Sequence, residues 1–165
     1  MNHTSVVVVN GSRARFFILE PAELGSAEGG PNLREREDMI NPDVEVHERE
    51  LWTELKSGRN RPGGGGQAHG YDDHRDEHLD EFKRRFAREV AREAAGLVRE
   101  TGSQRLVLAA QKRMLGFLRE ALDPLLQTGV KVIEVTKDLS KMPPHELHQY
   151  LAREKLVPPR RRPEF

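Results

Sequence analysis

The apolar residues near the start of the chain favour β-strands. Residues 6–9 are four consecutive valines, and such a β-branched run predicts a strand buried on both faces. Asn10 and Gly11 follow, and because both tolerate positive φ we expect a two-residue hairpin turn. Residues 14–19 then predict the returning strand, and residues 35–40 predict a third, weaker one. The first forty residues therefore indicate an antiparallel unit.

The most regular pattern lies in residues 73–100, where apolar residues recur at steps of three, four and seven. These steps place one set of side chains on a single helix face: Leu79, Phe82, Phe86, Val90, Leu97 and Val98, with Ala87, Ala91 and Ala94 beside them. Asp72 or Asp73 is suited to cap the start of this helix, and Gly102 to adopt the left-handed conformation after its end. We expect this apolar face to belong to the core.

The remaining pattern alternates strands with helices. Apolar runs predict strands at 106–110 and 130–135, a stripe of leucines predicts a helix at 114–126, and Pro143-Pro144 favours the start of a last helix. This order predicts an α/β fold with a mixed five-stranded sheet and helices on both faces. A ribonuclease-H-like arrangement fits the order, but the pattern does not distinguish it from other three-layer α/β folds.

Length and loop composition predict a single domain. A chain of 165 residues is long enough for one substantial core, which we assign to residues 1–157. Residues 41–73 are rich in glycine and polar residues, and they predict a mobile loop. A structureless segment of this length inside a compact domain is more often functional or disordered than idle. Residues 158–165 form a basic tail.

Composition restricts the classes of partner. Lys and Arg total 27, as do Asp and Glu, so no overall positive charge attracts nucleic acid and any such binding requires a local patch. Because the chain has no cysteine, disulfides, thiolate metal sites and thiol nucleophiles are excluded. The longest apolar run near the start is too short for an export signal or a membrane span. We therefore expect a cytoplasmic protein with neither a membrane nor DNA as partner.

Several blocks of the sequence together resemble one protein family. They span nearly the whole chain in the family's order: 9–17, 74–75, 86–89, 106–110, 115–119, 135–140 and 143–151. Their succession is similar to the host attachment proteins, bacterial relatives of the central domain of archaeo-eukaryotic peptide release factors. The resemblance implies the fold of that central domain, ribosomes and peptidyl-tRNA as partners, and no cofactor. One departure is Gln111-Lys112-Arg113, which replaces the family's more usual proline-bearing turn.

The resemblance also implies a catalytic tripeptide, Gly65-Gly66-Gln67, just before the long helix. In those release factors a Gly-Gly-Gln at a loop tip enters the peptidyl-transferase centre. Glycines let the backbone approach RNA closely, and the N–H of Gln67 would stabilise the oxyanion formed when water attacks the ester. Two sets of arginines would bind phosphates without reading sequence: Arg59 and Arg61 in the loop, and Arg160, Arg161 and Arg162 in the tail.

These features also have simpler interpretations. Four consecutive glycines are typical of a flexible linker, and arginines between prolines of a solvated terminus. His74, Glu77 and His78 fit the spacing of inverted zinc peptidases, but acidic residues also favour a helix start, so we predict no metal site. Asp138 follows a strand at a position where α/β sheets bind ligands, although we expect it to cap a turn.

Three classes of function therefore remain open. The first is an enzyme, an esterase that hydrolyses peptidyl-tRNA in ribosome release or rescue through Gln67. The second is a ribosome- or RNA-binding protein without chemistry. The third is an interaction module that acts through a partner protein and is only indirectly linked to attachment to host cells.

Overall fold

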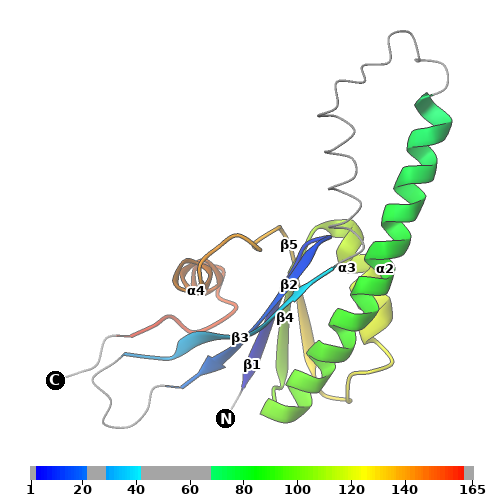
Figure 1. The fold of residues 1–165 in the computed structure, drawn as a ribbon. Helices are drawn as coiled ribbons and strands as arrows, with labels where there is room; N and C mark the ends of the chain where they lie inside the picture. Colours follow the sequence, from blue (N-terminus) through cyan, green and yellow to red (C-terminus); the bar gives the residue numbers. More distant parts are fainter. Residues whose placement is uncertain (1–2, 22–28, 42–67, 162–165) are drawn as a thin grey trace.

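A mixed five-stranded sheet forms the centre of the molecule in the computed structural model, which describes residues 3–21, 29–41 and 68–161 (Figure 1). The strands lie in the order β3-β2-β1-β4-β5. β1, β2 and β3 are antiparallel neighbours, while β4 and β5 run parallel to β1. The predicted mixed sheet is thus confirmed. The bounds are Thr4–Val9 for β1, Arg13–Glu20 for β2, Asn32–Ile40 for β3, Arg105–Ala110 for β4 and Lys131–Thr136 for β5.

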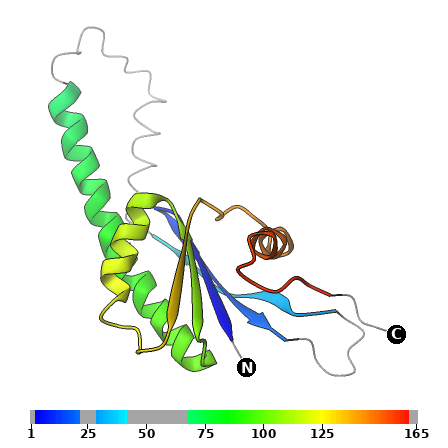
Figure 2. The same cartoon turned by 180° about the vertical axis from the view of Figure 1, so that it is seen from behind.

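Helices cover both faces of this sheet. α2 (Ala68–Thr101) and α3 (Lys112–Leu122) pack on one face, and α4 (Pro144–Arg153) packs on the other (Figure 2). The valines of β1 show why its apolar run is continuous: Val7 and Val9 face α2 and α3, whereas Val6 and Val8 face α4. A strand with a core on each side needs apolar residues at every position.

The long helix α2 begins earlier than the sequence predicts. It starts at Ala68, so residues 68–73 of the expected loop are helical, and Asp72 and Asp73 lie inside the helix rather than capping it. The apolar stripe marks only the part of the helix that packs on the sheet. A helix start inferred from this stripe therefore lies too late in the sequence. At the other end Gly102 has a φ of +67°, as predicted. Residues 42–67 lie outside the described ranges.

Only the later part of α2 lies in the core. None of the residues from Glu77 to Arg85 is buried, whereas Phe86, Ala87, Val90 and Ala91 are fully or almost fully buried. The amino-terminal part of the helix therefore extends past the sheet (Figure 1). Within the described ranges, no helix is long and apolar enough to cross a membrane.

The hairpin between β1 and β2 differs from the two-residue turn expected at Asn10-Gly11. Residues 10–12 connect the strands, and neither Asn10 nor Gly11 has a positive φ. Instead, the side-chain Oδ1 of Asn10 accepts hydrogen bonds from the backbone N–H groups of Ser12 (2.8 Å) and Arg13 (2.7 Å). The asparagine thus forms the turn by side-chain capping, a second way in which this residue type favours turns.

α3 is shorter than predicted. It ends at Leu122 rather than continuing to residue 126, because Pro124 lacks an N–H and its ring disfavours a helix interior. α4 begins at Pro144, with Pro143 as its N-cap, in agreement with the expectation.

A carboxylate pair joins β3 to α2 and makes stability depend on pH. A hydrogen bond with Glu37 raises the pKa of Glu93, and partial burial and the negative charges of Glu37 and Glu100 raise it further. A raised folded-state pKa gives stabilisation that is present at acidic pH and is lost as the pH rises through that pKa. We expect Glu93→Gln to increase the free energy of unfolding at pH 7 by less than about 1 kcal/mol, because the pair faces solvent.

Urea unfolding at pH 7 and pH 4 measures this effect. At pH 4 the gain should be smaller, because a raised pKa favours the protonated form of Glu93 in the folded protein at acidic pH. Glu120→Gln, which removes an exposed carboxylate from α3, is the matched control and should show no such gain at pH 7. An equal gain for Glu93→Gln at both pH values would contradict the carboxylate pair.

Candidate functional site

The carboxyl ends of three parallel strands meet at one edge of the sheet. Asn10 follows β1, Gln111 follows β4, and Asp138 comes shortly after β5. From β1 the chain turns to β2 on one side, whereas β4 leads to β5 on the other. In open α/β sheets, ligands bind outside the carboxyl ends of strands at such a divergence. A ligand site is therefore expected at this edge.

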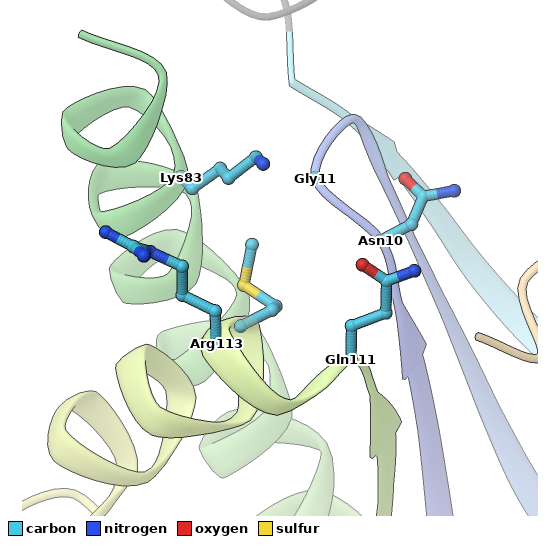
Figure 3. Close-up of a pocket in the computed structure, with 6 residues that line it drawn as sticks. Asn10, Gly11, Lys83, Gln111 and Arg113 are labelled. Carbon is cyan, nitrogen blue, oxygen red and sulfur yellow. The ribbon is translucent and has the colours of Figure 1, made fainter. Parts of the chain in front are cut away.

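A small hollow lies at this edge, between the β1–β2 turn and the two helices. It has a volume of about 40 Å³ and is lined by Asn10, Gly11, Lys83, Gln111, Arg113 and Met114 (Figure 3). The absence of a side chain at Gly11 lets Lys83 lie over the turn, because a Cβ there would stand 2.8 Å from Lys83 Cε. A hollow of this size holds one or a few water molecules rather than a substrate.

The charged residues that line the hollow are both cations. Lys83 reaches it from α2, and Arg113 from the first turn of α3, where Gln111 is the N-cap residue but makes no side-chain capping hydrogen bond. Arg113 also forms an ion pair with Asp80 of α2. Among the described residues, no group of three or more His, Asp or Glu could hold a metal ion. Chemically, this edge can attract and orient an anion.

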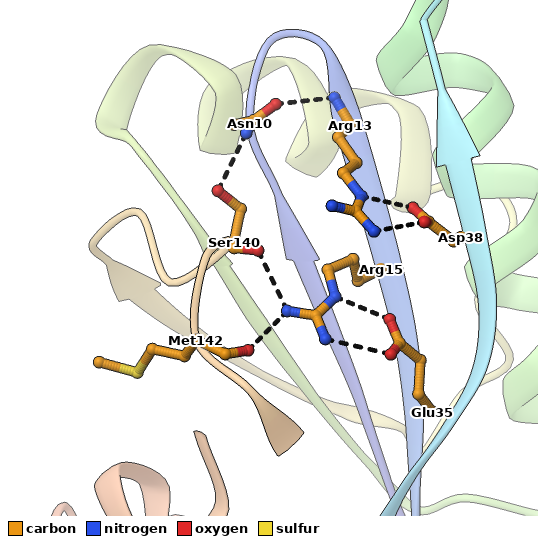
Figure 4. A network of polar contacts seen from close by, with 7 residues as sticks. All are labelled: Asn10, Arg13, Arg15, Glu35, Asp38, Ser140 and Met142. Carbon is orange, nitrogen blue, oxygen red and sulfur yellow. Dashed lines mark hydrogen bonds and ion pairs between the residues drawn. The ribbon is translucent and has the colours of Figure 1, made fainter. Parts of the chain in front are cut away.

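A buried arginine supports the same edge from the opposite face of the sheet. Arg15 of β2 is only 6% exposed. Its Nε and Nη2 donate to the two carboxylate oxygens of Glu35, at 2.7 and 3.1 Å, and its Nη1 donates to the carbonyl oxygens of Ser140 (3.1 Å) and Met142 (2.6 Å) (Figure 4). Its guanidinium also lies 5.0 Å from the ring centroid of Phe17. Arg15 thus joins β2, β3 and the connection after β5.

Ser140 links this arginine to the hairpin turn. Its Oγ accepts a hydrogen bond from Nδ2 of Asn10 at 2.9 Å, and its N–H and O–H both donate to Oδ1 of Asp138. The expected turn-capping role of Asp138 is confirmed. Since Asn10 and Asp138 are occupied by these hydrogen bonds, both residues shape the edge of the sheet rather than supplying free ligands.

Most of the site residues expected from the sequence lie outside the described ranges. These are Gly65, Gly66, Gln67, Arg59, Arg61 and Arg162. Arg160 and Arg161 are described and exposed, and the backbone of Arg161 pairs with that of Gly30 through hydrogen bonds of 3.0 and 3.1 Å. His148 Nε2 also lies 2.9 Å from the carbonyl oxygen of Pro158. The start of the expected tail is therefore attached to the domain.

The structure does not bring Arg160 and Arg161 to the carboxyl edge. Gly30, the backbone partner of Arg161, precedes β3, which pairs there with the end of β2. That is the end of the sheet opposite to Asn10 and the hollow, because β2 runs antiparallel to β1. The two groups of cations therefore lie at opposite ends of the sheet.

Sequence reasoning missed Arg15, Lys83 and Arg113. Arg15 had a detectable signal, because a charged residue inside an apolar strand must find buried partners. Lys83 and Arg113 gave no such signal, since charged residues on helices are usually solvated.

Comparison with known proteins identifies the family. The model of a family described as "Protein required for attachment to host cells" matches residues 5–151, so the chain belongs to that family. This confirms the resemblance to the host attachment proteins. Among curated proteins, none matches.

Two similar solved structures are a type II variant of the Ppx/GppA phosphatase of Aquifex aeolicus and a member of the same protein family from that organism. Both are 15% identical to this chain and cover 81% of it, with TM-scores of 0.38 and 0.35. This chain spans about a third of their length, 36% and 35%. Such weak likenesses identify neither the type of α/β fold nor an activity.

The network around Arg15 predicts an unequal effect of two arginine substitutions on one strand. Arg15→Met should lower the free energy of unfolding by about 2–4 kcal/mol, because two carbonyl groups and a partly buried carboxylate lose their donor. Arg13→Met, the matched control, breaks only the pair with Asp38, whose side chains are 46% and 39% exposed, and should cost less than about 1 kcal/mol. Chemical denaturation measures both, and equal losses would refute the central role of Arg15.

Proposed function

We propose that this member of the host attachment family is a ribosome-directed esterase that hydrolyses peptidyl-tRNA through Gly65-Gly66-Gln67. The observation that carries the proposal is the position of the tripeptide in the chain relative to α2. Gln67 is bonded directly to Ala68, the first residue of a 34-residue helix whose amino-terminal part extends past the sheet (Figure 1).

This extension of α2 is long enough to reach a substrate that the globular part of the protein cannot reach. Ala68 lies about 27 Å along the helix axis from Phe86, the residue at which α2 enters the core, at 1.5 Å per residue. A single helix with its side chains is about 10–12 Å across, much narrower than the domain. This narrow shape supports a model in which the sheet and its packed helices stay outside a narrow ribosomal cavity and the start of α2 enters it.

The proposed chemistry needs few groups from the protein. Water attacks the carbonyl carbon of the ester, the bond between that carbon and the ribose oxygen breaks, and the proton passes to the ribose oxygen. The products are a free peptide and deacylated tRNA. The backbone N–H of Gln67 would donate to the oxyanion of the intermediate, and its amide side chain would limit what fits beside the attacking water.

The strand order supports the finer fold assignment that this function implies. An antiparallel β1–β2–β3 unit followed by two parallel strands on the other side of β1 fits a ribonuclease-H-like arrangement, as expected for a release-factor central domain. With ribosomes and peptidyl-tRNA as partners, we place the action of the protein in the cytoplasm.

A non-catalytic role in binding ribosomes or RNA is the second candidate. It is favoured by the arginines that α2 and α3 expose beside the same extension. Such a protein would use the fold and the cations without the tripeptide. Activity and binding must therefore be measured separately.

Release of labelled peptide from ribosomes that carry peptidyl-tRNA tests the proposal. Gln67→Pro removes the backbone N–H at a position before the helix, where proline is tolerated, and should lower the release rate about 10²–10³-fold, as losing one oxyanion donor does. Gly66→Ala should also impair release, by restricting the backbone. Both variants should still pellet with ribosomes.

Gly63→Ala is the matched control, because it makes the same change within the glycine run but outside the tripeptide. It should release peptide at the wild-type rate. Pelleting of the wild type without release would exclude the esterase and favour the non-catalytic binder. Equal release by the wild type and Gln67→Pro would remove the tripeptide from the mechanism.

A further inference from the structure

One outward face of α2 carries a cluster of arginines that the function proposed above does not use. Arg84, Arg85 and Arg88 from α2 and Arg113 from α3 line an open groove of about 600 Å³, together with three acidic residues, Glu77, Asp80 and Glu81. Each α2 residue in this set has another member three or four positions away in the sequence, so they share one side of the helix. α3 adds Arg113 across the groove.

Contacts within the groove hold three of these four arginines in place. Glu81 Oε1 accepts a hydrogen bond from Arg85 Nη2 at 2.8 Å, and Asp80 pairs with Arg113. The guanidinium of Arg84 lies 5.1 Å from the ring centroid of Phe117, as in a cation–π contact. Glu81 and Asp80 thus position two of the arginines and do not merely cancel their charge.

These contacts leave the side chains of the paired arginines largely exposed to solvent. The side chain of Arg85 is 55% exposed and that of Arg113 is 70% exposed, although both are paired. A guanidinium has five N–H donors, so one that donates to a carboxylate keeps others for a second anion. Fixing these long side chains in advance reduces the entropy lost when they bind.

We infer that this groove binds the sugar-phosphate backbone of RNA. Exposed, fixed guanidinium groups match phosphate oxygens in shape and charge, and an open groove admits a continuous strand rather than a small enclosed ligand. The whole chain has 27 basic and 27 acidic residues, so attraction to RNA must come from a local cluster of this kind. Contacts to phosphates position a protein without reading sequence.

The identity of the RNA rests on the proposed function, which supplies ribosomal RNA or tRNA as the source of the backbone. Arg84 and Arg88 lie about 24–30 Å from Ala68 along the axis of α2. A strand bound in the groove would set how far the amino-terminal part of α2 extends beyond it. The groove therefore has a positioning role, separate from the chemistry assigned to Gln67.

The experiment compares two double variants of the full chain. Arg84→Gln/Arg88→Gln removes two cations from the groove, and Arg34→Gln/Arg153→Gln removes two exposed cations from β3 and α4. Affinity for ribosomes, and for a single-stranded RNA of mixed sequence, is measured over a range of salt concentrations. Thermal unfolding shows that each variant is folded.

The groove variant should bind more weakly, and its dependence on salt should be less steep. Each phosphate contact contributes about 0.7 to the slope of log affinity against log salt for a single strand, so losing two should reduce the slope by about 1.4. The control pair should bind like the wild type. An unchanged slope in the groove variant, or the same loss in the control, would overturn the inference. So would polyglutamate competing as well as RNA, because the groove would then recognise acidic protein.

The results separate this inference from the proposed function. If Gln67→Pro abolishes peptide release while the groove variant keeps the wild-type slope, the esterase stands and the groove does not bind RNA. If the groove variant loses affinity for RNA while no protein releases peptide, the groove binds RNA and the esterase is excluded.

Discussion

The buried guanidinium of Arg15 is the interaction on which the arrangement of the sheet edge depends. A charged group that is nearly inaccessible to solvent is tolerated only when its donors find acceptors, and Arg15 finds them on β3 and on the connection after β5. The carbonyl of Ser140 lies 125 residues away in sequence. The first hairpin and the connection after β5 therefore stabilise each other where they meet at Arg15.

This constraint extends to the candidate site through Ser140. The same residue receives a hydrogen bond from Asn10, whose other contacts form the β1–β2 turn. That turn provides one wall of the hollow beside Lys83. A structural arginine on one face of the sheet thus helps to hold a positively charged edge in place on the other.

α2 combines two roles that place different demands on one helix. Its later part supplies buried side chains to the core, while its earlier part has no buried residue between Glu77 and Arg85. A helix without tertiary packing is only marginally stable in water. The ion pairs Glu81–Arg85 and Asp80–Arg113 therefore help to keep this part of α2 helical. The contacts that stabilise the extension are also those that fix the arginines of the groove.

The sequence by itself determined which segments are buried and on how many sides. The valines of β1, the apolar stripe of α2 and the order of strands and helices were predictable, because side-chain periodicity reports burial locally. Periodicity does not report which distant segment covers a face. The partners of Arg15 and the meeting of Arg113 with the arginines of α2 were therefore decided only by tertiary structure. Both depend on where another element of the fold packs.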